Sequence, residues 1–181
     1  MKTYSVKPLS AILAIAAIFL FVFSGCKKKS NKPEIIYRTY TATVQLKGSN
    51  EVPVVTTTGS GTADITYREQ SKTIEYTINW QLGSAVATTT GMHFHGADNG
   101  SNSVSSPIVI EIPGFSTGSS GTLTGTTRAL NATEINQLLS GKWYVNIHSS
   151  DFTSGEIRGN IVLVAASTGG GGGNNGGGGT Y

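Results

Sequence analysis

The side chains best suited to specific chemistry are those of the three histidines, His93, His95 and His148. His93 and His95 flank Phe94 in a segment with the character of a β-strand, where side chains two apart share a face about 6.5–7 Å apart. His148 ends a second strand-like segment. If these two segments are neighbours in a sheet, the three imidazoles form a compact site on its outer face, while Phe94 points into the core.

A three-imidazole site favours particular metals. Neutral imidazole nitrogens suit Cu(II) or Zn(II) better than Mg²⁺ or Ca²⁺, which prefer oxygen ligands. We therefore expect copper, with zinc as the second choice, and Asp98 is the nearest carboxylate for a fourth ligand or an outer-shell contact. The same residues are also compatible with a structural polar cluster that holds no metal. The chain has one cysteine, which excludes a thiolate-rich metal site and an intramolecular disulfide.

Two other patterns predict structure rather than chemistry. Residues 114–118 match the G-x-S-x-G pattern of a nucleophile elbow, but turn and strand formers follow them where that motif requires a helix. We expect a turn there. Glu156 and Arg158 share a strand face and predict a surface ion pair, which is usually worth under about 1 kcal/mol.

The elements that must position the histidines are short strands in which apolar and polar residues alternate. This period of two, rich in Thr and β-branched residues and punctuated by Gly, Ser, Asn and Pro, recurs around 42–46, 63–67, 74–80, 108–112, 122–127, 143–148 and 156–164. The pattern predicts an all-β domain over residues 37–166. We expect a Greek-key β-sandwich or barrel of about eight strands, immunoglobulin-like or superoxide-dismutase-like.

One short helix of about two turns is predicted before the strand of His148. Asn131 and Glu134 have the spacing of a capping box, and Gly141 stands where a C-terminal cap is expected. Between them, Ile135, Leu138 and Leu139 form an apolar stripe.

The first residues predict a targeting signal. Lys2 and Lys7 precede a 15-residue run, 9–23, that is apolar except for Ser10. This run is short for a membrane-spanning helix but long enough for the apolar part of a signal sequence. The run ends in Phe-Ser-Gly-Cys, which resembles a bacterial lipobox. We expect residues 1–25 to be a lipoprotein signal peptide and Cys26 to carry lipid. The protein would then be anchored outside the cytoplasm, at the outer membrane or cell surface.

The remaining segments predict no packed structure. Residues 26–36 have the composition of a flexible basic spacer and residues 167–181 that of a Gly-rich disordered tail. The net charge of +3 comes from the leader and spacer, because residues 33–168 carry seven Lys and Arg against ten Asp and Glu. Without a basic stripe on the domain, we expect no nucleic-acid partner.

Four motifs in order resemble the CHRD (chordin) domain family. They are Ser-Asn-Glu-Val-Pro at 49–53, Met-His-Phe-His-Gly at 92–96, Gly-Lys-Trp-Tyr-Val-Asn-Ile-His-Ser at 141–149 and Gly-Glu-Ile-Arg-Gly at 155–159. The resemblance covers about residues 40–164 and implies a bacterial lipoprotein member of that family. One departure is Val54, where family members often have a second proline. The resemblance identifies the fold better than the activity.

The paired and distant histidines are also similar to the copper ligands of copper–zinc superoxide dismutase. That enzyme needs a further bridging histidine and a disulfide, and this chain has neither. We therefore expect a non-enzymatic, lipid-anchored binding protein for an unidentified protein or small ligand, with copper the first candidate. The alternatives are a metal-dependent redox or scavenging enzyme, and an adhesion or interaction module with structural histidines.

Overall fold

The computed structural model describes residues 1–3, 35–101 and 103–166. Cys26, the predicted tail, and almost all of the predicted signal peptide and spacer lie outside this range. Among the described residues, no helix is long and apolar enough to cross a membrane.

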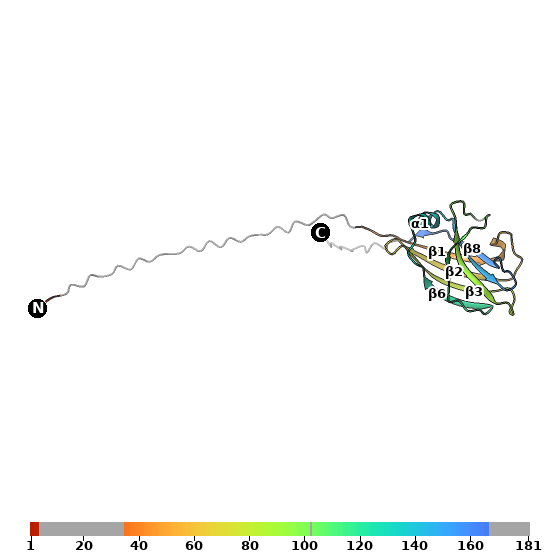
Figure 1. The fold of residues 1–181 in the computed structure, drawn as a ribbon, viewed down its shortest axis with the longest axis horizontal. Coiled ribbons are helices and arrows are strands. Elements are labelled where there is room, and N and C mark those ends of the chain that lie inside the picture. Colours follow the sequence, from red (N-terminus) through yellow and green to blue (C-terminus); the bar gives the residue numbers. More distant parts are fainter. Residues whose placement is uncertain (4–34, 102, 167–181) are drawn as a thin grey trace, which may run out of the picture. The chain divides into compact units, whose positions relative to one another are not determined.

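The described part of the chain folds as an antiparallel sheet, which confirms the all-β prediction (Figure 1). Its strands are β1 (Thr39–Lys47), β2 (Ser60–Arg68), β3 (Thr73–Gln81), β4 (Thr89–Gly96), β5 (Ile108–Glu111), β6 (Ser120–Thr126), β7 (Trp143–Ser149), β8 (Ile157–Asn160) and β9 (Val164–Ala165). Their order is β5-β4-β7-β8-β1-β2-β3-β6, with β9 on β1. The predicted strand over 156–164 is therefore two short strands, β8 and β9.

The sheet is curled so that the inner faces of its two halves pack together. Tyr76 of β3 and Phe94 of β4 are well separated in the strand order, yet their ring centroids lie 5.6 Å apart in an edge-to-face contact. Phe94 also contacts Trp143 of β7, with ring centroids 6.3 Å apart. Phe94 is fully buried, as its position between two outward residues predicts.

The helix α1 (Ala132–Leu139) begins and ends as the sequence predicts. The Asn131 side chain accepts from the Glu134 backbone N–H, and the Glu134 carboxylate accepts from the Asn131 N–H, which completes the capping box. Leu138 is buried, but Leu139 of the predicted apolar stripe is exposed. Gly141 adopts φ +70°, the left-handed conformation that glycine favours after a helix. The chain then enters β7, whose Trp143 indole donates to the Gln137 amide oxygen at 3.3 Å.

The connection between β5 and β6 contains the predicted turn. No helix follows residues 114–118, and the Ser116 hydroxyl accepts from the Gly118 N–H at 3.2 Å. Ser116 therefore caps its own turn and is not placed as a nucleophile.

The predicted surface ion pair between Glu156 and Arg158 is wrong, because both side chains are buried. Glu156 accepts from the Gly83 N–H and the Thr57 hydroxyl at 2.6 and 2.8 Å. Arg158 donates to the Ser101 carbonyl at 2.9 Å. Loops from distant parts of the chain cover this end of β8, and strand alternation alone does not reveal such a cover.

Candidate functional site

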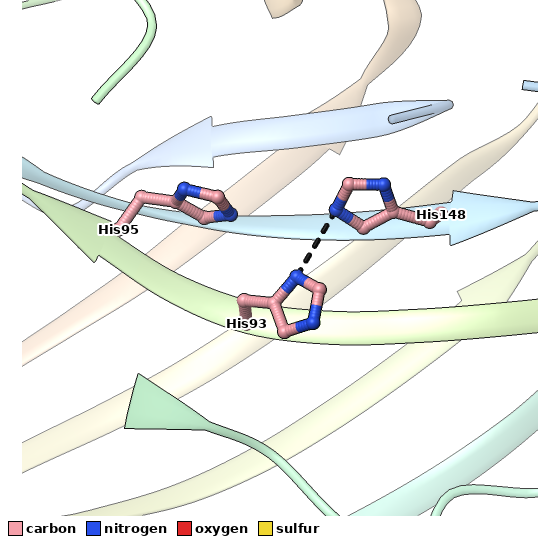
Figure 2. A group of neighbouring side chains, drawn as sticks. All are labelled: His93, His95 and His148. Carbon is pink, nitrogen blue, oxygen red and sulfur yellow. Dashed lines mark hydrogen bonds between the residues drawn. The ribbon is translucent and has the colours of Figure 1, made fainter. Parts of the chain in front are cut away.

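The register of β4 against β7 brings the three histidines together. Gly91 lies opposite His148, and His95 lies opposite Tyr144. One ring nitrogen of each histidine lies within 4.8 Å of the others. Figure 2 shows the rings of His93 and His95 on one strand turned toward His148 on its neighbour.

The outer face that carries the histidines is not open to solvent as expected. His95 is 7% exposed, and the other two histidines are half-buried. The connection between β4 and β5 lies over this face, where the Ser106 N–H donates to the Tyr144 hydroxyl at 3.0 Å. Ser105 of the same connection donates to the Val52 carbonyl at 2.9 Å. The histidines thus share the face opposite the apolar core, as predicted, but a loop covers it.

Backbone carbonyls orient two of the three rings. Nδ1 of His95 lies 2.8 Å from the Ser106 oxygen, and Nδ1 of His148 lies 2.9 Å from the Thr153 oxygen. A carbonyl oxygen only accepts hydrogen bonds, so the ring nitrogen facing it carries the hydrogen. When such a ring is uncharged, its Nε2 is left with a free lone pair.

A carboxylate orients the third ring. Glu111 of β5 lies opposite His93 of β4, and its Oε2 is 2.8 Å from His93 Nε2, which leaves Nδ1 with the free lone pair. Sequence reasoning missed Glu111, although the inward Ile110 and Ile112 beside it place it on the outer face. Asp98 does not join the histidines, because its carboxylate accepts from the Gln137 side chain of α1 at 2.9 Å.

The three free lone pairs point into one small space. Nδ1 of His93 and Nε2 of His148 are 3.1 Å apart, the contact drawn dashed in Figure 2. Nε2 of His95 is buried and has no hydrogen-bond partner. Lone pairs at such distances repel one another unless a proton or a metal ion lies between them. An outer hydrogen bond that fixes which nitrogen faces the centre is typical of metal-binding histidines, so these residues fit a metal ion.

Burial favours the neutral form of the His93 and His95 rings. It lowers the pKa of His95 to about 4, and it lowers the pKa of His93 against the opposing effect of the Glu111 carboxylate. Because metal binds neutral imidazole and not imidazolium, both rings are in the binding form at neutral pH.

A stack of side chains continues from His95 across the sheet. The His95 ring lies parallel to the Tyr144 ring, with centroids 4.7 Å apart, and the Arg158 guanidinium lies 3.4 Å from the Tyr144 centroid. The strands β4 and β8 flank β7, so His95 and Arg158 reach Tyr144 from its two neighbouring strands. This packing restricts the His95 ring to one orientation.

A second polar group adjoins the histidines. Asn146, opposite His93 in the register, donates to the Glu51 carboxylate at 3.4 Å. Glu51 is only 5% exposed, and burial raises its pKa to about 7, while the nearby Arg158 charge opposes that rise.

The raised pKa of Glu51 predicts a pH-dependent stability. Glu51 binds its proton more tightly in the folded protein, so its contribution to stability is complete below pH 4.5 and is lost as the pH rises toward 7. Glu51→Gln removes this titration. We expect the free energy of unfolding of the variant, relative to the unmodified protein, to increase by about 3 kcal/mol between pH 4.5 and 7. Urea denaturation at both pH values, with a chelator present, measures the difference, and the same difference at both values would contradict the prediction.

The fold and the site define an all-β domain whose histidines converge beneath a loop. The family model for the CHRD domain matches residues 42–161, and the chain belongs to this family. No curated protein and no solved structure matches the chain. The family match supports an extracellular binding or interaction module as the general function. Each of the four motifs in the sequence contributes to the outer face described above: Glu51, His93 and His95, Asn146 and His148, and Arg158.

Proposed function

We propose that this protein is an extracytoplasmic CHRD-domain binding protein that holds copper through His93, His95 and His148. The observation that carries the proposal is that one ring nitrogen of each histidine lies close to those of the other two. The other nitrogen of each ring is held by a hydrogen bond to a carbonyl or carboxylate oxygen, which fixes the orientation of the ring. Nδ1 of His93 and Nε2 of His148 lie within hydrogen-bond distance of each other, but a cluster with only a structural role would also give the third nitrogen a donor. Here the buried Nε2 of His95 has no partner.

The ligand set favours copper over zinc. Nitrogen sites bind Cu²⁺ more tightly than Zn²⁺ as a general order of affinity. Structural zinc sites usually have four protein ligands, whereas the described residues bring only these three histidines into the group.

Calorimetric titration of the chelator-treated full chain with Cu(II) and Zn(II) tests the proposal. We expect one Cu(II) per chain, with a dissociation constant below about 10 μM at neutral pH and weaker binding of Zn(II). Absence of Cu(II) binding in this range would favour an interaction module with structural histidines.

A redox or scavenging enzyme is the second candidate function. The observation in its favour is the three-histidine ligand set, because a metal held by three protein ligands keeps a position for water or substrate. Turnover of superoxide or peroxide by the copper-loaded chain separates this candidate from a binding protein.

Glu111 offers a sharp test of how the site is organised. Glu111→Ala removes the acceptor for His93 Nε2–H, and we expect Cu(II) affinity to fall about 10–100-fold, as is typical when an outer-shell partner is lost. Glu111→Gln keeps an oxygen acceptor and removes the charge, so it should lose less. Glu111 is exposed, and neither variant should unfold the domain. Equal affinity in the unmodified chain and Glu111→Ala, measured by competition with a chelator, would show that His93 is not positioned in this way.

The anchoring of the protein is part of the proposal. We expect Cys26→Ala to release the protein from membranes or to block its maturation, because Cys26 is the proposed lipid attachment point. Ser24→Ala keeps a small residue before the cysteine and serves as the matched control. Membrane fractionation decides the question, and a Cys26→Ala protein that is still processed and membrane-bound would overturn the lipoprotein assignment.

A further inference from the structure

The strand β6 forms an edge of the sheet that no other described strand covers. Within residues 35–101 and 103–166 it pairs with β3 alone and stands at one end of the strand order (Figure 1). A cleft of about 490 Å³ is lined by residues 124–126 of β6 and by residues 109–111 of β5, the strand at the other end of the order. The edge of β6 therefore opens onto a cleft and is not paired with β5.

The register of β6 shows which of its backbone groups are free. The Thr127 N–H donates to the Ile74 carbonyl at 2.9 Å, so Thr127 and every second residue before it turn their backbone groups toward β3. In an antiparallel pair, the residues between them turn their N–H and C=O groups the other way. The residues whose backbone groups point to the open edge are Ser120, Thr122, Thr124 and Thr126.

This edge lacks the features that usually prevent strands from pairing. Natural edge strands are protected by charged side chains, prolines, bulges or short length. β6 has seven residues, Ser-Gly-Thr-Leu-Thr-Gly-Thr, with no charge and no proline, and its register with β3 is unbroken. By contrast, β5 is four residues long, lies between Pro107 and Pro113, and pairs with β4 through a shift in register. The difference indicates that β6 is the edge suited to pairing with another strand.

The sequence of β6 is complementary to itself. When the strand is reversed about Leu123, threonine meets threonine, glycine meets glycine, and serine meets threonine. A second copy related by a two-fold axis therefore brings side chains of similar size together and places no charge against another charge. The reversal also brings Thr122 opposite Thr124, so the backbone groups that point to the open edge in one copy meet those of the other.

We propose that β6 pairs antiparallel with β6 of a second copy of this chain, with Leu123 of each copy at the two-fold axis. The sheet then continues from one copy into the other, and Leu123, which is only partly buried at the edge of the core, lies against its counterpart. One pair of strands is a small interface, so the dimer is weak and reversible. The proposal does not depend on copper, because the histidines lie on β4 and β7.

Sedimentation equilibrium of the chelator-treated full chain, in a nonionic detergent, measures the association. We expect a dimer with a dissociation constant on the order of 10–100 μM. Thr124→Lys places a charge at the paired edge of each copy, and it should weaken the dimer at least about tenfold. Gln45→Lys is the matched control, because it adds the same charge at an exposed position of β1, and it should leave the association unchanged.

A disulfide tests the register in which the two strands pair. Leu123→Cys, in a Cys26→Ala background that removes the native thiol, places two cysteines directly opposite each other. Their Cα atoms would be about 4.5 Å apart, within the range of a disulfide. We expect oxidised glutathione to convert this variant to a covalent dimer.

Thr122→Cys in the same background is the control for the register. Its counterpart in the second copy lies two residues further along the strand, beyond the roughly 7 Å between Cα atoms that a disulfide can span, so little covalent dimer should form. No association up to about 1 mM, an association that Thr124→Lys leaves unchanged, or equal cross-linking at positions 122 and 123 would overturn the proposal.

Discussion

Replacing any one of His93, His95 or His148 with alanine is expected to weaken Cu(II) binding strongly. The loss should exceed the roughly 10–100-fold that is typical when a residue hydrogen-bonded to a metal ligand is removed. Each change removes one of only three nitrogens that converge within 4.8 Å. Two remaining imidazoles leave the ion with half of its coordination supplied by water. The dissociation constant, measured by competition with a chelator of known affinity, provides the readout.

The three variants should differ in their effect on the metal-free protein. His95 is buried and stacked on Tyr144, so His95→Ala should also lower the free energy of unfolding, whereas His148→Ala at a half-buried position should lower it less.

The matched control for these variants is Thr153→Ala. Thr153 holds His148 through its backbone oxygen, which the substitution keeps, so Cu(II) affinity should not change. Unchanged affinity in the His148→Ala variant would mean that His148 is not a ligand, and the three residues would then be structural histidines.

Phe94→Ala is expected to lower the free energy of unfolding by about 3–5 kcal/mol, the largest effect on stability that we predict. Phe94 is fully buried between Tyr76 and Trp143, where the two halves of the curled sheet meet. Removing the ring leaves a cavity that rigid strands on both sides cannot close. Urea denaturation of the chelator-treated protein measures the loss.

Phe115→Ala is the control for this prediction, because the same ring is removed at a partly buried position on the edge of the core. It should cost clearly less. Because Phe94 points away from the histidines, Phe94→Ala should affect copper only indirectly. A loss of stability equal to that of Phe115→Ala would mean that Phe94 does not fill the core as the strand alternation indicates.

Local features of the sequence predicted the local features of the fold. The alternation around Phe94 placed that ring in the core and its two flanking histidines on the other face, because successive residues of a strand point to opposite sides. The spacing of Asn131 and Glu134 predicted where α1 begins, because a capping box is formed by residues three apart in the chain.

The composition of the site depended on tertiary structure. That β4 and β7 are neighbours, so that His148 meets His93, follows from pairing across 55 residues, which strand alternation does not specify. Glu111 reaches His93 only because β5 pairs with β4 in that register. The nearer carboxylate in sequence, Asp98, is instead engaged by α1.

The least predictable parts of the site are those supplied by backbone atoms. Ser106 and Thr153 orient two histidines through their carbonyl oxygens, a group that every residue has, so no residue type marks these positions in the sequence. No residue type in the sequence marks the loop that covers the outer face and buries His95 either. Strand alternation, which is visible in the sequence, indicates which side chains share a face, whereas the packing of distant segments sets which nitrogens are free to bind.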